Sequence, residues 1–314
     1  MDREMDLFSV ADEYLQLRRQ LGFKLVTFSK VLHSFLNFMA ANHATVLTTD
    51  LAVQWAMNAP RSTDRYTWGR RLMIVRIFAR YAYSCDDRHE VPPQDVLPCP
   101  SRRALPYIYS DAEIRALMDA AGKMQPPFRG LTLATFIGLL AVTGMRTGEA
   151  HRLNLEDLDL AHGIVKIHDA KFNKSRDLPI HPTTVAVLSS YLLHRAEFLG
   201  KDGPIAAVFL DTLKHRLRDH SVTLYMGDFL KAAGIVPVGR PRPRLHDLRH
   251  AFATQTLLRW YAQGRDVPAS MPLLSTYLGH VDPQATYWYL TGTTELMGLA
   301  AAQLSSAVEK RWES

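Results

Sequence analysis

Cysteine is scarce in this sequence of 314 residues, with only Cys85 and Cys99, and the two do not form a CxxC pair. Two cysteines are too few for a disulfide framework, so the sequence fits a reducing compartment. Long apolar runs are lacking as well. The longest, residues 131–145, contains threonine and glycine and is shorter than the ~18 residues that suggest a membrane span. We therefore interpret it as a buried helix.

Signals for export and for metal chemistry are also missing. The first residues, MDREMDLFSV, contain no cationic segment followed by an apolar one, so we expect no signal peptide and a cytoplasmic, nucleoid-associated protein. No carboxylates show the spacing of a two-metal site, which argues against a Mg²⁺-dependent nuclease. We expect neither a metal ion nor another cofactor.

Basic residues are in excess: 37 Lys and Arg against 31 Asp and Glu give a formal charge of +6 and a pI near 9.3. This excess favours a polyanionic partner. Apolar residues make up 47% and charged residues 22%, which is typical of a globular protein, and the length suggests two domains.

The first part of the chain has apolar side chains at helical spacing. We expect helices over residues 8–21, 27–41 and 49–57, and a fourth from the capping residues 62–64 to about residue 84. The fourth helix contains five arginines: Arg65, Arg70, Arg71, Arg76 and Arg80. They either form a solvated helix face or neutralise DNA phosphates, which supply most non-specific affinity.

Proline-rich residues 89–105 lack a helical period and predict a semi-extended linker. We expect a helical DNA-binding domain over residues 1–88 and a second domain over 106–302. Residues 303–314 form the C-terminal tail. The predicted fold class is mainly α with a small β-sheet, in which a helical bundle precedes a mixed α/β domain.

The second domain begins with a predicted capping box, Ser110 to Glu113, followed by a helix to residue 121 and a buried helix over 127–142. Residues 163–168 and 176–180 read as two strands around a polar turn. Helical patterns return from residue 182.

Four segments contain side chains that can do chemistry. Arg146 follows the buried helix and a glycine turn, with Glu149 three residues later, so it can reach a phosphate or simply pair with that glutamate. His246 and Arg249 share a helix face, and His280 follows Gly279 at a helix end. The fourth segment contains two tyrosines, Tyr287 and Tyr289.

His246 and His250 could be two ligands of a metal, but the glutamate of an HExxH site is absent and Arg249 would repel a cation. Arginines and histidines with a nearby tyrosine instead suit a phosphodiester transition state. The tyrosine hydroxyl would be the nucleophile. Arg244, which precedes this segment, is a further candidate DNA contact.

These segments resemble the catalytic domain of the tyrosine recombinases, also called the phage integrase family. TGMRTGEA resembles the first arginine box, LHDLRHAFAT the second, and LGH followed by a tyrosine nine residues after the histidine the third. The resemblance extends from about residue 106 to the tail, and more loosely to the family's core-binding domain. The TYWYL segment is similar to that of transposon-borne integrases.

The resemblance implies a role for each matching residue. Arg146 and Arg249 would clamp the scissile phosphate, His280 would donate a hydrogen bond to it, and His246 would assist proton transfer. Tyr289 would be the nucleophile and Glu149 would hold the first-box helix, while Tyr287 would pack. On the hairpin turn, Lys171 aligns with the family's general acid. Phe172 replaces a small residue there, so Lys174 remains an alternative.

The activity implied is site-specific recombination of double-stranded DNA through a 3′-phosphotyrosyl link, without metal or ATP. Family members act as tetramers on two DNA sites, so a homo-tetramer is implied, or a hetero-oligomer with related recombinases. Residues 293–308 would form a final helix that packs on its own domain or on a neighbouring subunit. A type IB topoisomerase and a catalytically silent DNA-binding protein are the alternative interpretations.

Overall fold

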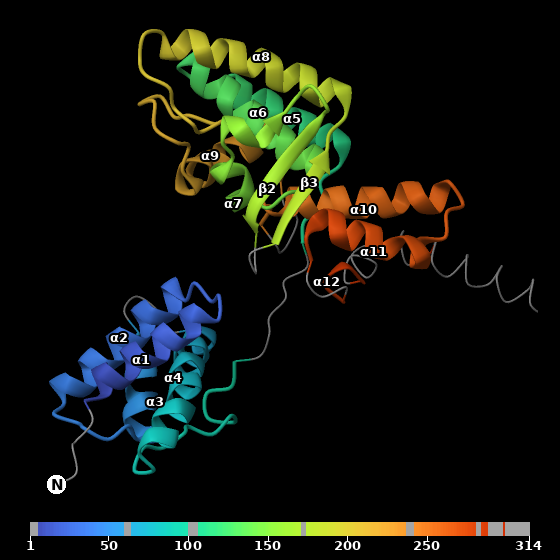
Figure 1. Ribbon diagram of the computed structural model, residues 1–314. Coiled ribbons are helices and arrows are strands. Elements are labelled where there is room, and N and C mark those ends of the chain that lie inside the picture. The colour runs from blue at the N-terminus through green and yellow to red at the C-terminus, as the bar shows by residue number, and fades with distance from the viewer. Residues whose placement is uncertain are drawn as a thin grey trace, which may run out of the picture. The chain divides into compact units, whose positions relative to one another are not determined.

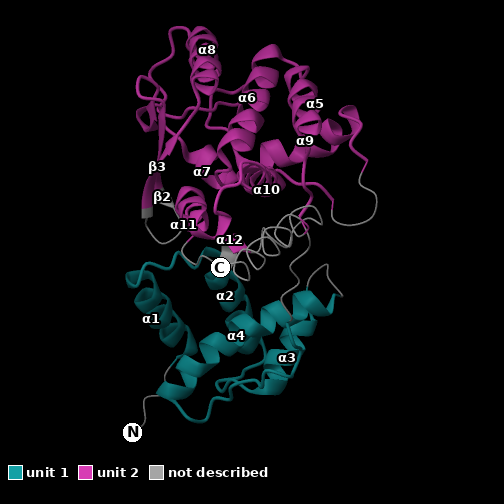
Figure 2. Cartoon of the chain, turned by 90° about the vertical axis from the view of Figure 1, so that its right-hand side faces the viewer, with its two compact units in different colours: residues 1–103 teal, residues 104–314 magenta. Residues whose placement is uncertain are grey.

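The chain forms two compact units, residues 1–103 and residues 104–314 (Figures 1 and 2). The computed structural model describes residues 6–59, 64–99, 106–170, 174–236, 242–280, 284–287 and 298. They are mostly helical with one small sheet, as the sequence predicts. Within these residues no helix is both long and apolar enough to cross a membrane. Apart from residue 298, the predicted tail helix lies outside them.

The described part of unit 1 is a helical bundle. Its helices are α1 (Leu7–Gln20), α2 (Val26–Ala41), α3 (Thr49–Met57) and α4 (Arg65–Cys85). The side chains of Asp6, Thr48 and Asp64 cap α1, α3 and α4 by accepting a backbone N–H. Helix α4 packs against the other three and buries its apolar face in the core of the unit.

The first part of the predicted linker packs against α4. Arg76 is 7% exposed, and its guanidinium donates to the carbonyl oxygens of Pro92, Pro93 and Val96 at 2.7–2.9 Å. A Cβ on Gly69 would lie 3.0 Å from the carbonyl oxygen of Leu97. Residues 92–97 therefore belong to the packed body of unit 1, because α4 supplies donors for their carbonyls.

Unit 2 is built around a buried helix. Its helices in the described residues are α5 (Asp111–Gly122), α6 (Pro127–Thr143), α7 (Thr147–Arg152), α8 (Pro182–Leu199), α9 (Asp219–Ala232), α10 (Asp247–Ala262), α11 (Val267–Leu278) and α12 (Gln284–Tyr287). Helix α6 packs against α5, α8 and α10 (Figure 1). The capping box predicted at Ser110 and Glu113 is present.

The sheet is small and antiparallel, with strand order β1 (Leu158–Asp159), β2 (Ile164–Ala170) and β3 (Lys174–Pro179). Val165 and Leu178 face each other across β2 and β3 and are fully buried. Paired residues share one face of a sheet. Arg176, which pairs with buried Ile167, therefore faces the protein interior.

Candidate active site

The site lies where two helices of unit 2 end at glycines. Gly144 ends α6 and Gly279 ends α11, both in the left-handed region with φ of 59° and 70°. A Cβ on Gly144 would lie 2.5 Å from the Phe252 ring, so the turn requires glycine in two ways. These glycines stop the helices and leave carbonyl oxygens unpaired within the helix.

The side chain of Arg146 joins these two turns. Arg146 is the N-cap residue of α7, two residues after Gly144, and its Nη2 donates to the carbonyl oxygen of Gly279 at 2.8 Å. Its Nη1 donates to Oε1 of Glu149 at 2.8 Å, while its backbone N–H donates to Oε2 at 2.9 Å. The Arg146 side chain is 26% exposed, so solvent reaches part of it.

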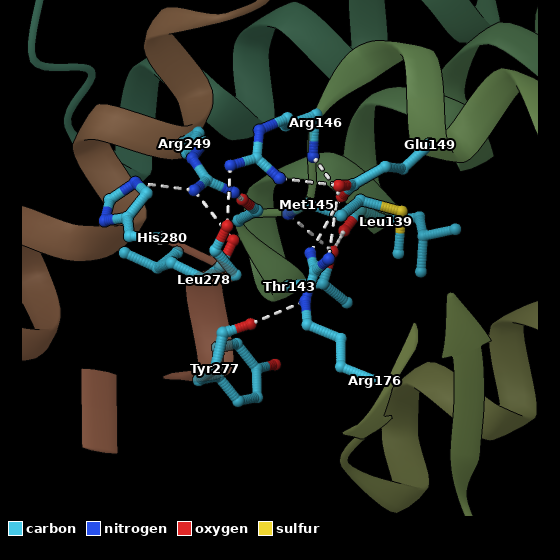
Figure 3. Close-up of polar contacts among 12 residues, drawn as sticks. Leu139, Thr143, Met145, Arg146, Glu149, Arg176, Arg249, Tyr277, Leu278 and His280 are labelled. Atoms are coloured by element: carbon cyan, nitrogen blue, oxygen red, sulfur yellow. Dashed lines mark hydrogen bonds and ion pairs between the residues drawn. The ribbon is translucent and has the colours of Figure 1, made fainter. Parts of the chain in front are cut away.

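Arg249 makes the reciprocal connection from α10. Its Nη1 donates to the carbonyl oxygen of Gly144 at 2.9 Å, and its Nη2 donates to that of Leu278 at 2.8 Å. The residue is 3% exposed. Figure 3 shows the side chains of Arg146 and Arg249 converging on the same point. Two positive charges are thus held together against the ends of α6 and α11.

His280 completes this side of the cluster. An arginine can only donate, so Nε2 of His280 accepts from Arg249 Nη2 at 2.8 Å (Figure 3). The ring proton is then on Nδ1 and is donated to Oγ1 of buried Thr286 at 2.7 Å. Burial, together with Arg249 and Arg146, lowers the pKa of His280 to about 4. The imidazole is therefore neutral at pH 7.

Two further histidines lie on α10 or at its start. The rings of His246 and His250 meet edge to face with centroids 5.3 Å apart. His246 presents surface to solvent, yet the surrounding protein and Arg249 lower its pKa. Burial and the neighbouring His246 lower the pKa of His250 to about 4. Neutral imidazoles of this kind can accept a proton.

Glu149 is the anionic centre of the site, with 1% of its side chain exposed. Burial raises its pKa, but hydrogen bonds from Arg176 and Arg146 outweigh that effect and lower it to about 2. Arg176 donates Nη1 to Oε1 at 3.1 Å and Nη2 to Oε2 at 2.8 Å. Its Nε donates to the carbonyl oxygen of Tyr277 at 2.9 Å (Figure 3). Arg176 thus connects the sheet to α7 and α11.

The structure places the predicted side chains unevenly. It brings Arg146, Glu149, Arg249 and His280 into one network, with His246 at the start of the same helix as Arg249. Tyr289 and Lys171 lie outside the described residues, and so does the side chain of Lys174. Tyr287, expected to pack, is 46% exposed.

Arg244 lies at the edge of the cluster. Its Nη2 donates to Oδ1 of buried Asp247 at 2.9 Å, and the Arg244 side chain is 55% exposed. This hydrogen bond raises the pKa of Arg244. The side chain is therefore a fixed positive charge that solvent can reach.

The arginines of α4 have different surroundings. Arg65, Arg70 and Arg80 are exposed. Arg71 is half-buried, with its guanidinium 3.9 Å from the centre of the Trp55 ring and Nη2 bonded to the Trp55 carbonyl oxygen at 2.9 Å. Arg76 is a correction to the set of predicted DNA contacts, because its guanidinium is buried and bound to backbone carbonyls.

Two residues of the network were not predicted as site residues. The sequence predicts Arg176 only as the first residue of a strand. In the structure it pairs with buried Ile167, so its charge faces inward. Thr286 lies on α12, where the tyrosines drew attention instead. A signal for Arg176 is its place two residues after Lys174 in a K-x-R pattern, whereas nothing comparable in the sequence marks Thr286.

Comparison with known proteins identifies this arrangement. The family model described as the phage integrase family matches residues 109–295. A protein of Sinorhizobium fredii named as an integrase/recombinase, y4rB, is 40% identical over 307 residues, which is 96% of each chain. Tyrosine recombinase XerD of Mycobacterium tuberculosis is 33% identical and spans 73% of this chain and 70% of its own.

Solved structures share the fold. The XerH site-specific recombinase bound to difH in a post-cleavage complex aligns with a TM-score of 0.62 at 17% identity, over 89% of this chain and 79% of its own. The Tn1549 transposon integrase in complex with transposon right-end DNA aligns with a TM-score of 0.62 at 14% identity. That alignment spans 95% of this chain and 98% of the integrase chain.

Proposed function

The chain belongs to the phage integrase family of tyrosine recombinases, whose activity is site-specific DNA recombination, and we propose that it cleaves and rejoins duplex DNA through a 3′-phosphotyrosyl intermediate. The observation that supports this most is the convergence of Arg146, Arg249 and His280. They come from three separate segments and meet at two helix ends, where a phosphate could replace carbonyl oxygens as hydrogen-bond acceptor.

In the proposed step, the Tyr289 hydroxyl attacks phosphorus. A Tyr–O–P bond forms, the P–O5′ bond breaks, and O5′ takes a proton from Lys171, with Lys174 as the alternative donor. Attack by a 5′-hydroxyl from a second duplex reverses the chemistry. Arg146 and Arg249 stabilise the charge on the non-bridging oxygens. Every atom and proton is supplied by the protein and the DNA, so we propose that no metal is required.

The histidines take complementary roles in this proposal. His246 is neutral at pH 7 because its pKa is lowered, so it can receive the proton of the tyrosine hydroxyl. His280 orients Arg249 in the free protein. A bound phosphate raises the pKa of a nearby histidine, because an opposite charge favours the charged form. His280 would then donate Nε2–H to the phosphate.

The proposed assembly is a homo-tetramer on two DNA sites, or a hetero-oligomer with related recombinases, acting at the nucleoid in the cytoplasm. A lambda integrase structure of the same fold is a tetramer bound to a Holliday junction. The exposed Arg65, Arg70 and Arg80 of α4 would contact phosphates. Half-buried Arg71 and surface Arg244 would add to this contact.

Covalent trapping tests the proposal. Wild-type protein and Tyr289→Phe are mixed with nicked duplexes from the flanks of the gene and run on a denaturing gel, with Tyr287→Phe as the matched control. We expect a protease-sensitive adduct on the 3′ strand from wild type and Tyr287→Phe, and none from Tyr289→Phe. An adduct that persists in Tyr289→Phe and disappears in Tyr287→Phe would assign the nucleophile to Tyr287.

A further inference from the structure

Arg176 occupies an unusual place for a charged side chain. It stands on β3 opposite buried Ile167, where the pleat directs the side chain inward, and only 10% of the side chain is exposed. A position of this kind is normally apolar, since burying a charge is costly unless it is paired and hydrogen-bonded. Each of the three guanidinium nitrogens of Arg176 accordingly donates a hydrogen bond, which indicates that this residue holds other elements in place.

The contacts of Arg176 join three elements. Its two Nη atoms form a bidentate pair with Glu149 of α7, and its Nε donates to the carbonyl oxygen of Tyr277 in the last turn of α11. The planar fork of a guanidinium fixes direction as well as distance when it binds a carboxylate in this way. Strand β3 is therefore held in one orientation against the helices that position Arg146 and His280.

The turn at Gly279 is shaped around the same side chain. A Cβ on Gly279 would lie 2.8 Å from Nη1 of Arg176 and 3.0 Å from its Cζ. The guanidinium thus packs directly against the backbone that accepts a hydrogen bond from Arg146. The backbone of Gly279 limits the Arg176 guanidinium on one side, and the ion pair with Glu149 holds it on the other.

We propose that Arg176 is a positioning residue that fixes the β2–β3 hairpin relative to the two-arginine clamp, so that a lysine of the hairpin reaches the leaving oxygen. This inference rests on the proposed function. Arg176 lies two residues after Lys174 and five after Lys171. It acts through the strand that it anchors and does not itself touch DNA.

A change of leaving group separates this role from a general loss of structure. In the normal substrate, O5′ needs a proton as the P–O5′ bond breaks. When sulfur replaces that bridging oxygen, the P–S bond breaks and the thiolate leaves without a proton, because a thiol is far more acidic than an alcohol. A defect in delivering the proton is therefore relieved by sulfur, whereas a defect in the clamp or in folding is not.

The experiment measures single-turnover cleavage of both substrates by full-length protein. We expect Arg176→Gln to cleave the oxygen substrate about 100-fold more slowly than wild type, the lower end of what a general acid contributes. We expect it to cleave the sulfur substrate within about 5-fold of wild type. Arg176→Lys retains the positive charge but lacks the planar guanidinium. Its rate on the oxygen substrate should lie between those of wild type and Arg176→Gln. DNA affinity in a mobility-shift assay should stay within about 2-fold of wild type.

Arg195→Gln is the matched control. Arg195 is another buried arginine of unit 2, 5% exposed and bonded to the carbonyl oxygens of Ile205, Ala207 and Val208. If Arg195→Gln cleaves more slowly than wild type, the fold-reduction in rate should be the same for the oxygen and the sulfur substrate. If Arg176→Gln does not fold, Arg176→Lys provides the comparison.

Equal losses on oxygen and sulfur for the Arg176 variants, or no loss on either, would overturn the positioning role. Failure of the proposed function has a different outcome, in which wild-type protein forms no adduct with either substrate.

Discussion

At the scale of single residues, the three arginines Arg146, Arg176 and Arg249 each donate a hydrogen bond to a backbone carbonyl oxygen. Arg146 reaches from the end of α6 to the carbonyl oxygen of Gly279, and Arg249 donates from α10 to carbonyl oxygens at both helix ends. Their orientation is therefore fixed before DNA is present, which reduces the reorganisation needed when charge develops on a phosphate. The energetic cost of placing these positive charges together is offset in part by Glu149.

The tautomer of His280 depends on Thr286. The Thr286 side chain is fully buried and accepts the Nδ1 proton of His280. Thr286→Val retains the shape and removes the acceptor, so Nδ1–H is left without its partner. Loss of one such hydrogen bond costs about 1–3 kcal/mol, and we expect single-turnover cleavage to slow about 10-fold. Thr286→Ser, which retains the hydroxyl, should cleave at nearly the wild-type rate; equal rates for the two variants would contradict this role.

Histidine burial makes stability depend on pH. The folded-state pKa values of His250 and His280 are about 4, below the usual value of 6.5. Between pH 4 and 6.5 the unfolded chain therefore binds more protons than the folded chain. The contribution of these histidines to the free energy of unfolding is fully present above pH 6.5 and is lost as the pH falls toward 4. Each histidine contributes a slope of up to about 1.4 kcal/mol per pH unit. We expect His250→Gln to reduce the slope measured by urea unfolding at pH 5–7. An unchanged slope would show that His250 titrates normally.

The sequence predicts much of this network, including Glu149 at its centre, but neither Arg176 nor Thr286. Arg146, Arg249 and His280 each stand in a segment with a recognisable turn or helix signal, and the structure brings them together. Arg176 was missed as a site residue because its importance comes from contacts with Glu149 and Tyr277, which are 27 and 101 residues away. Local periodicity contains no information about such contacts. The partner of Thr286, His280, is only six residues away, but the sequence contains no signal that the two side chains meet.

At the scale of elements, capping residues explain why the helices were predictable. Asp64 caps α4 and Ser110 caps α5 at the positions read from the sequence. Strand β1 was not predicted, because two residues have no detectable period. Residues 92–97 of the predicted linker pack against α4, because three of their carbonyl oxygens accept hydrogen bonds from Arg76. The sequence alone cannot assign these hydrogen bonds.

Helix α4 has two kinds of arginine, and their substitution should separate stability from binding. Arg76→Ala leaves three carbonyl oxygens without their donor. We expect the free energy of unfolding of unit 1, measured by urea denaturation, to fall by about 3 kcal/mol. Exposed Arg80 is the matched control: Arg80→Ala should change stability by less than about 0.5 kcal/mol. The reverse order of stabilities would contradict the assignment of Arg76 to the interior.

The exposed arginines should be visible in the salt dependence of DNA binding. Each phosphate contact contributes about −0.9 to the slope of log affinity against log salt concentration. For Arg70→Ala with Arg80→Ala, we therefore expect a slope less steep by about 1.8, measured by fluorescence anisotropy between 50 and 200 mM salt. An unchanged slope would show that these exposed side chains do not contact phosphates.

At the scale of the whole molecule, the chain consists of two units with separate hydrophobic cores. The apolar core of unit 1 is formed by α1–α4, and that of unit 2 is centred on α6. Each unit has the buried apolar interior that an independently folding domain requires. The described residues of the candidate site belong to unit 2, while α4 of unit 1 presents exposed cations.

Under the proposed function both units bind one DNA, so the affinity of the chain should depend on the covalent connection between them. We expect residues 1–103 and residues 104–314, produced separately, each to show a cooperative thermal transition, because each retains its core. Linking two binding modules raises overall affinity by about 10²–10⁴-fold through effective concentration. An equimolar mixture of the fragments should therefore bind a specific site at least about 100-fold more weakly than the intact chain, measured by anisotropy at fixed salt. If residues 104–314 alone matched the intact chain, recognition would belong to unit 2 and the cations of α4 would be a solvated face.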